Sequence, residues 1–137
     1  METLMPTIKT ILLIEDDLDI SDVTNIFLTS RGYKVEHHFG MDSYEKYLRV
    51  VREVKPNLIL SDIFVPGIDG KKLCEFVKSD EDLSHIPYIL YSAASFSRKE
   101  IANFPGEYFL PKPFSLDKLE SVITEALHGE KERQEAA

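Results

Sequence analysis

The sequence has a single cysteine, Cys74, among 137 residues, so neither an internal disulfide framework nor a cysteine-rich zinc cluster can form. Its longest apolar runs are four residues, far short of the roughly 20 needed to cross a bilayer. No basic segment followed by an apolar stretch opens the chain, so no signal peptide is predicted. Positive charge is also scarce, because the net charge is −8. We therefore expect a cytoplasmic protein that binds neither nucleic acid nor membrane directly.

Apolar residues are plentiful. Leu, Ile, Val and Phe supply 43 of the 137 residues, well above the roughly 20% that marks disordered chains. The length fits one compact domain and leaves no room for a second full one.

Two hydrophobic periods alternate along the chain. Short apolar runs, which are typical of strands covered on both faces, occur at Ile11–Ile14, Leu58–Leu60, Ile89–Tyr91 and Tyr108–Leu110. The alternation of Val35, His37 and Phe39 with polar residues predicts a half-exposed edge strand.

Helical stripes lie between and after these runs. Their apolar members are Ile20, Val23 and Phe27; Tyr44, Tyr47, Leu48 and Val51; Leu73, Phe76 and Val77; and Leu116, Leu119, Ile123, Ala126 and Leu127. A short fourth helix is predicted between Ser97 and Phe104. The third helix is expected to begin at Asp69-Gly70. The last is expected to be capped by Ser115 and to close near Gly129, with the tail as helix extension or fray. Five strand–helix repeats predict an α/β fold, a parallel sheet with helices on both faces.

Polar side chains follow four of the predicted strands. Parallel strands bind ligands outside their carboxyl ends, so these residues should converge at one edge of the sheet. They are Glu15, Asp16 and Asp17; Asp62; Ser92; and Lys112. Each alone is better explained as a cap or a turn residue. Together they suit a hard cation such as Mg²⁺, and a metal and a lysine flanking one carboxylate would support phosphoryl transfer to it.

Four motifs at these strand ends make the chain similar to a known family. It resembles the receiver domain of bacterial two-component response regulators, the CheY-like family, over roughly residues 8–128, with 1–7 and 129–137 as terminal extensions. The matching motifs are Ile-Leu-Leu-Ile-Glu-Asp-Asp, Asp62-Ile-Phe-Val-Pro-Gly-Ile-Asp-Gly70, Tyr91-Ser92-Ala93 and Lys112-Pro113-Phe114. The resemblance implies a flavodoxin-like, doubly wound (βα)5 fold whose five-stranded parallel sheet has the order 2-1-3-4-5.

The resemblance also implies a metal site. Asp62 matches the phosphoacceptor, and Asp16 matches the direct Mg²⁺ ligand. Glu15 matches the neighbouring acid that binds the ion through water, and the backbone carbonyl of Phe64 matches a further protein ligand. Asp17 is expected to cap the first helix, with a share in the metal site as the alternative.

The phosphoryl group has its own matched residues. Ser92 corresponds to the hydroxyl that hydrogen-bonds the phosphoryl group, and Lys112 to the lysine that pairs with it. Phe109 corresponds to the aromatic switch that changes rotamer when Ser92 moves inward. The Lys112–Pro113 peptide bond is cis in the family.

Two departures from the family pattern stand out. The 20 residues from Ser92 to Lys112 are fewer than is usual in the family, which leaves the output surface and any homodimer there open. Phe64 and Ala94 occupy positions where polar side chains commonly orient hydrolytic water. Neither can do so, and we expect slow self-dephosphorylation.

The function implied is a phosphorylatable signalling switch rather than an enzyme, catalysing only its own phosphotransfer and dephosphorylation. Its partners would be a sensor histidine kinase or a histidine phosphotransfer protein, and a downstream target or effector domain. The rival is a degenerate receiver that binds partners without phosphorylation. An aspartyl-phosphate phosphatase would need a second Asp at position 64, where this chain has Phe64, and this argues against that class. A flavin-nucleotide binder is disfavoured because Glu15, Asp16 and Asp17 would repel its phosphate.

An initiating Met and a charged tail modestly favour a stand-alone regulator over a piece of a longer protein.

Overall fold

The computed structural model describes residues 7–65, 67–92, 106, 108–111 and 115–136, and within these ranges the side chains of residues 64, 65, 92, 111 and 130–136 are not described. The elements run β1 (Thr10–Ile14), α1 (Leu18–Ser30), β2 (Lys34–His38), α2 (Tyr44–Val54), β3 (Leu58–Asp62), β4 (Phe64–Val65), β5 (Ile68–Asp69), α3 (Gly70–Ser79), β6 (Tyr88–Ser92), β7 (Tyr108–Pro111) and α5 (Leu116–Ala136). The predicted fourth helix lies outside the described residues.

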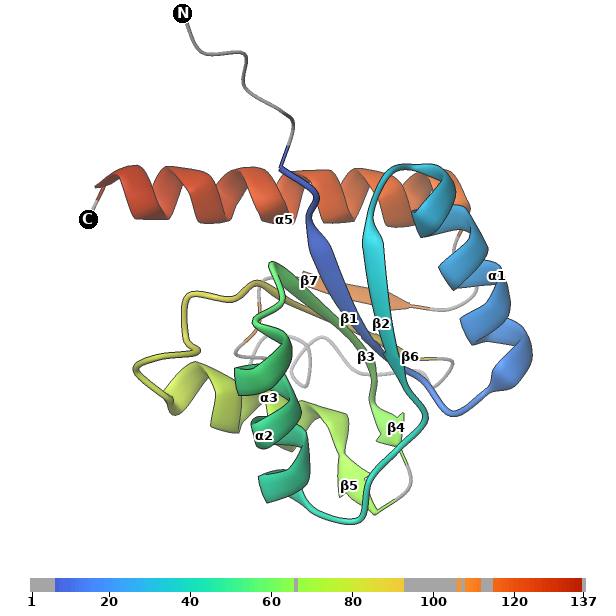
Figure 1. Cartoon of the computed structure of the whole chain (residues 1–137), viewed down its shortest axis with the longest axis vertical. Helices are drawn as coiled ribbons and strands as arrows, with labels where there is room; N and C mark the ends of the chain where they lie inside the picture. The colour runs from blue at the N-terminus through green and yellow to red at the C-terminus, as the bar shows by residue number, and fades with distance from the viewer. Residues whose placement is uncertain (1–6, 66, 93–105, 107, 112–114, 137) are drawn as a thin grey trace, which may run out of the picture.

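Five strands form one parallel sheet in the order β2-β1-β3-β6-β7 (Figure 1). Numbered among themselves, these are strands 2-1-3-4-5, so the predicted order is confirmed. β2 lies at an edge and its residues are partly exposed, as the alternating pattern predicted. The pattern did not predict β4 and β5, which form a separate two-residue antiparallel ladder directly after β3.

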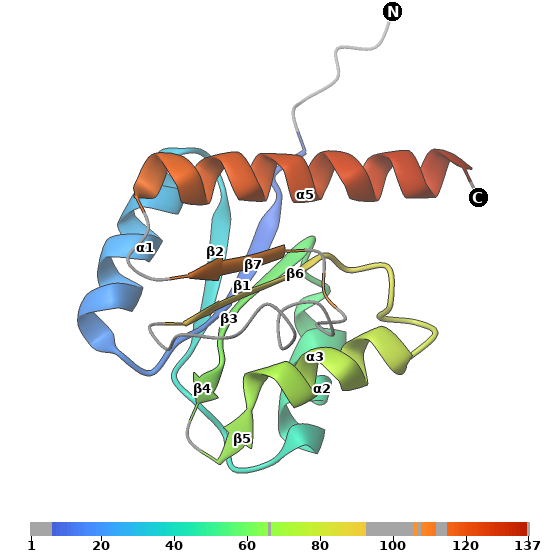
Figure 2. The same cartoon turned by 180° about the vertical axis from the view of Figure 1, so that it is seen from behind.

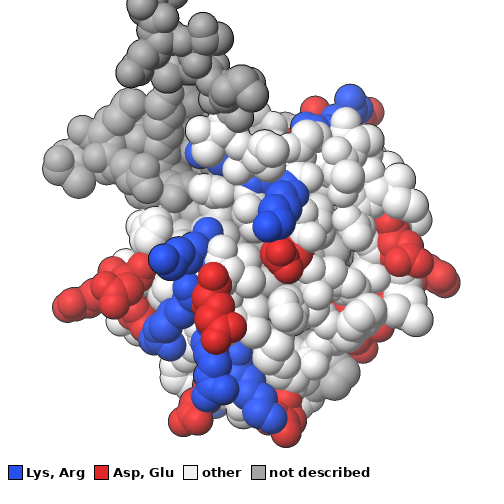
Figure 3. All heavy atoms as spheres, viewed as in Figure 1, with Lys and Arg blue, Asp and Glu red and all other residues white. Residues whose placement is uncertain are grey.

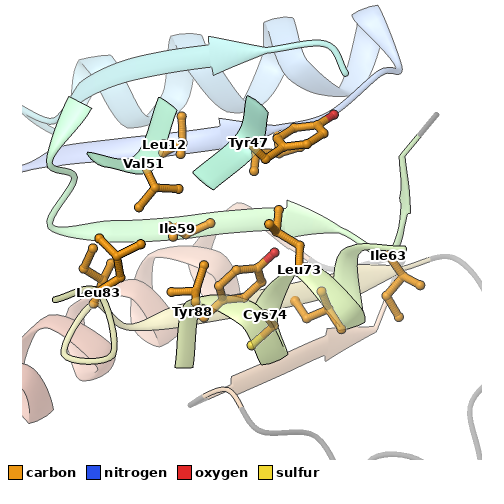
Figure 4. Close-up of a cluster of buried hydrophobic side chains, with 13 residues drawn as sticks. Leu12, Tyr47, Val51, Ile59, Ile63, Leu73, Cys74, Leu83 and Tyr88 are labelled. Atoms are coloured by element: carbon orange, nitrogen blue, oxygen red, sulfur yellow. The ribbon is translucent and has the colours of Figure 1, made fainter. Parts of the chain in front are cut away.

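Helices cover both faces of the sheet, and each face has its own core. On one face, α2 and α3 bury Tyr47, Val51, Leu73, Cys74 and Val77 against alternate residues of the strands (Figure 4). On the other, α1 and α5 bury Leu28, Leu119, Ile123 and Ala126 against the intervening strand residues. Figure 2 shows α5 running along the top of the sheet, on the side opposite to α2 and α3. Strands covered on both sides explain the unbroken apolar runs of β1, β3 and β6.

The helix ends follow the predicted capping residues. Asp69 begins α3 by accepting a hydrogen bond from the Lys71 N–H at 2.8 Å. Ser115 begins α5 by accepting one from the Lys118 N–H at 3.0 Å. α2 ends at Lys55, which takes a left-handed conformation (φ 53°) just before Pro56.

Two details of the helices differ from the sequence pattern. α1 buries Ser21, Thr24 and Leu28, whereas Val23 of the predicted stripe is 54% exposed. α5 does not close near Gly129 but continues to Ala136, which is the extension alternative. One glycine costs only about 1 kcal/mol in a helix, so it does not by itself end one. Among the described residues, no helix is both long and apolar enough to span a membrane.

Candidate functional site

Three carboxylates meet at the carboxyl edge of the central strands. Glu15 and Asp16 directly follow β1, and Asp62 is the last residue of the neighbouring β3. One carboxylate oxygen from each residue lies within 4.8 Å of the other two. The acidic residues that the sequence placed at two separate strand ends are therefore brought together.

Glu15 is held firmly although its carboxyl group is fully buried. Its Oε1 accepts a hydrogen bond from the Tyr91 hydroxyl at 2.9 Å, and its Oε2 accepts one from the Asp17 N–H at 3.2 Å. Its backbone is tied to β2, where its N–H donates to the His38 carbonyl at 3.2 Å and its carbonyl contacts His37 Nε2 at 2.9 Å. A buried carboxylate needs such donors, because leaving water without them costs several kcal/mol.

Asp16 and Asp17 have different environments. Asp16 is exposed to solvent and is one of the three clustered carboxylates. Asp17 is the N-cap of α1, and its Oδ1 accepts hydrogen bonds from the Asp19 and Ile20 N–H groups at 3.0 and 3.1 Å. The expected capping role of Asp17 is thus confirmed.

Asp62 is 8% exposed and sits on a backbone held from both sides. The next residue, Ile63, donates its N–H to the Tyr91 carbonyl at 3.1 Å and accepts from the Gly70 N–H at 2.8 Å. Gly70 packs so closely that an added Cβ would lie 2.2 Å from the Asp62 carbonyl oxygen. Tight contacts of this kind fix the position of the Asp62 carboxylate.

The β4–β5 ladder closes the loop after Asp62. Phe64 pairs with Asp69, so the segment that carries the Phe64 carbonyl turns back beside β3. The Tyr44 hydroxyl accepts a hydrogen bond from the Asp69 N–H at 3.0 Å, and Gly67 packs against the backbone of Met41 and Asp42. The loop is therefore anchored to the start of α2.

The remaining predicted residues lie on β6, on β7 or outside the description. Ser92 is the last residue of β6, next to Tyr91, the register partner of Asp62, and its side chain is not described. Phe109 lies on β7 as the partner of Leu90, partly buried against the core beneath α2 and α3. Lys112 and the Lys112–Pro113 peptide bond lie outside the described residues, as does Ala94.

Tyr91 is a residue of the site to which the sequence pattern assigned no role. It was predicted as an apolar strand residue and as the first member of the Tyr91-Ser92-Ala93 motif, whereas its hydroxyl reaches Glu15 from a strand two positions away in the sheet. A tyrosine beside a polar strand end is the signal that could have found it, because a buried phenol needs a polar partner.

The donor set fits Mg²⁺. The cation prefers oxygen ligands and one or two carboxylates, with water filling the rest of its shell. The clustered carboxylates repel one another, and a divalent cation relieves that repulsion. Asp16 is exposed, so water could complete the shell of an ion held there, whereas Glu15 and Asp62 are buried.

Comparison with known proteins agrees with this geometry. The chain is 31% identical over 111 residues to the DNA-binding dual master transcriptional regulator RpaA of Synechocystis sp., covering 80% of this chain and 45% of that protein. It is 36% identical over 118 residues to the transcriptional regulatory protein CrdR of Helicobacter pylori, covering 84% and 53%. The chain thus spans about half the length of the curated relatives it matches.

Solved structures and a family model point the same way. The signal receiver domain of a signal transduction histidine kinase from Syntrophus aciditrophicus superposes with a TM-score of 0.79 at 29% identity, covering 88% of this chain and 91% of that one. The model of the response regulator receiver domain matches residues 11–124. On this match, and on the acidic cluster at the carboxyl edge of the sheet, the chain belongs to the response regulator receiver domain family.

Proposed function

We propose that this chain accepts a phosphoryl group on Asp62 and uses the acyl phosphate as a signal. The observation that carries the proposal is the cluster of Glu15, Asp16 and Asp62 in a receiver fold. An Asp62 carboxylate oxygen would attack the phosphorus of a phosphohistidine. The new O–P bond forms as the P–N bond breaks, and the histidine nitrogen leaves with the electron pair.

The carboxylates and one carbonyl would hold Mg²⁺. We assign Asp16 and Asp62 as direct ligands together with the Phe64 backbone carbonyl, and Glu15 as a ligand through water. A bound Mg²⁺ supplies positive charge that offsets the charge developing on the transferring phosphoryl oxygens. The rigid backbone around Asp62 supports the required alignment, because positioning contributes much of the acceleration in such transfers.

Lys112, Ser92 and Phe109 complete the proposed switch. Lys112 would pair with the phosphoryl group, and Ser92 would donate a hydrogen bond to it. Movement of Ser92 would leave space for Phe109 to turn inward and change the surface around β7. This is a local charge change that biases a two-state element. On this proposal the chain catalyses only its own phosphotransfer and dephosphorylation.

The proposed partners are a sensor histidine kinase or a histidine phosphotransfer protein, and a downstream target or effector domain. RpaA is described as DNA-binding, but the present chain aligns with less than half of it. A net charge of −8 argues against nucleic-acid binding by this stretch itself, and on the face seen in Figure 3 Lys and Arg are interspersed with Asp and Glu. We propose residues 8–128 as the receiver unit, acting in the cytoplasm.

The test is phosphorylation by a small donor. Wild type incubated with phosphoramidate and Mg²⁺ should gain the mass of one phosphoryl group, and Asp62→Asn should gain none while keeping its fold by circular dichroism. Asp82→Asn, a change at an exposed aspartate, is the matched control and should be labelled like wild type. An unlabelled wild type would instead support the degenerate receiver, and labelling of Asp62→Asn would place the acceptor elsewhere.

A further inference from the structure

Glu15, Asp62 and Tyr91 form a row across three adjacent strands. β3 lies between β1 and β6 in the sheet. Ile14 is paired with Ser61, so Glu15 and Asp62 come next in line, and Asp62 is paired with Tyr91. The Tyr91 side chain belongs to the core on the α1 and α5 face, and its hydroxyl reaches back across the Asp62 position to Glu15.

The hydrogen bond from Tyr91 to Glu15 is shielded from water. Glu15 is fully buried and Tyr91 is 1% exposed, and the two oxygens are 2.9 Å apart. Burial raises the pKa of Tyr91 well above its ordinary value, and the nearby charges of Glu15 and Asp62 raise it further. In this contact the Tyr91 hydroxyl is the donor and the Glu15 carboxylate oxygen is the acceptor.

The bond also restricts the orientation of the Glu15 carboxylate. The Tyr91 hydroxyl donates to Oε1 and the Asp17 N–H donates to Oε2, so each carboxylate oxygen is held by a different donor. Loss of a donor that holds a metal-binding side chain in place typically weakens metal affinity about 10- to 100-fold. The phenol ring is itself fixed by the surrounding core, which makes it a rigid support.

We propose that Tyr91 is a positioning residue for the cation site, acting through Glu15. This inference rests on the proposed function, in which Glu15 binds Mg²⁺ through water. Tyr91 touches neither the cation nor the phosphoryl group. Its role is to keep the Glu15 carboxylate turned toward Asp16 and Asp62, which are the other members of the cluster.

The same strand provides a matched control in Tyr88. It is also a fully buried tyrosine, and its hydroxyl donates to the Gly70 carbonyl at 3.1 Å. Tyr88 lies in the core on the opposite face of the sheet, beneath α2 and α3. Tyr88→Phe thus removes a buried hydroxyl from β6, as Tyr91→Phe does, but this hydroxyl donates to a backbone carbonyl.

The test is a Mg²⁺ titration of the unphosphorylated full chain by isothermal calorimetry. Tyr91→Phe should weaken Mg²⁺ binding about tenfold, the low end of the effect expected when a supporting partner of a metal ligand is lost. Tyr88→Phe should bind Mg²⁺ within about twofold of wild type. In a Glu15→Gln background, Tyr91→Phe should have no further effect on the Mg²⁺ affinity, because the pathway through Glu15 is already altered.

A second measurement needs no substitution. In labelled wild-type protein, the Cζ resonance of Tyr91 should shift as Mg²⁺ is added, while that of Tyr88 stays in place. The inference about Tyr91 would be overturned if its resonance did not move. It would also be overturned if Tyr91→Phe bound Mg²⁺ as tightly as Tyr88→Phe does, or more tightly than wild type. Either result would leave the proposed function standing. Absence of Mg²⁺ binding by wild type would overturn the proposed metal site and this inference together.

Discussion

Gly70 is the position where a single added methyl group should disturb both folding and phosphorylation. It is the first residue of α3, and its N–H donates to the Ile63 carbonyl at 2.8 Å. An added Cβ would lie 2.2 Å from the Asp62 carbonyl oxygen and 3.0 Å from the Ile63 Cα. Both neighbours are backbone atoms, so no side chain can rotate to make room.

The structure sets the size of the effect. To bring the contact of the Gly70→Ala methyl with Asp62 from 2.2 to 3.0 Å, β3 and α3 must separate by about 0.8 Å. Overpacking of this kind costs about 1–3 kcal/mol, against at most about 1 kcal/mol that alanine gains over glycine in a helix. We expect a net loss of about 1–2 kcal/mol in the free energy of unfolding. A displacement near 1 Å at the acceptor should slow phosphorylation by up to about 100-fold.

Gly32→Ala is the comparison that separates crowding from backbone strain. Gly32 has φ +92°, and nothing lies within 4 Å of an added Cβ. Alanine at position 32 should lower the free energy of unfolding by about 1–2 kcal/mol, because it must adopt the left-handed conformation of Gly32. The rate of phosphorylation should stay unchanged. Urea denaturation and the rate of labelling by phosphoramidate measure the two effects. A Gly70→Ala protein as stable and as rapidly labelled as wild type would refute the reasoning.

The acidic loop, the phosphoryl pocket and the edge strand supply three further tests. Asp16→Ala should weaken Mg²⁺ binding in calorimetry far more than Asp17→Ala. Asp16→Ala should also stabilise the metal-free protein, because it relieves like-charge repulsion. Asp17→Ala should instead destabilise the protein, because it loses an N-cap worth about 1 kcal/mol. The reverse ranking in Mg²⁺ affinity would mean that the ligand assignment is shifted by one residue. The acyl phosphate of wild type should decay slowly. The double variant Phe64→Asn with Ala94→Glu should hydrolyse it about 5- to 150-fold faster, equivalent to a barrier change of about 1–3 kcal/mol. Equal decay rates would show that these side chains do not control the attacking water. Partial burial lowers the pKa of His38 in the folded chain, with the charge of Glu36 opposing the shift. The unfolded chain therefore binds the proton first as the pH falls through about 6.5, and this proton uptake favours unfolding. The urea midpoint of His38→Gln should accordingly be higher than that of wild type at pH 5.5 but not at pH 7.5.

Much of the fold was predictable from local patterns. The runs at Ile11–Ile14 and Leu58–Leu60 predicted strands because a strand covered on both faces must be apolar throughout. Ser115 and Asp69 predicted helix starts because their side chains satisfy free backbone N–H groups nearby in sequence. The acidic residues at two strand ends predicted a shared site because parallel strands end at one edge.

Other features depended on contacts between residues distant in the sequence. The apolar stripe of α1 suggested that Val23 would be buried, yet the helix packs through Ser21 and Thr24, because the neighbouring elements decide which face has room. Likewise, Glu15 accepts a hydrogen bond from Tyr91, 76 residues away, and a pattern local to either residue does not show that the two side chains meet. The sequence by itself determined the five strands of the main sheet, the presence of helices α1, α2, α3 and α5, and the sheet edge at which the carboxylates meet. Only the tertiary structure decided how those carboxylates are held, since side-chain orientation depends on packing across the sheet.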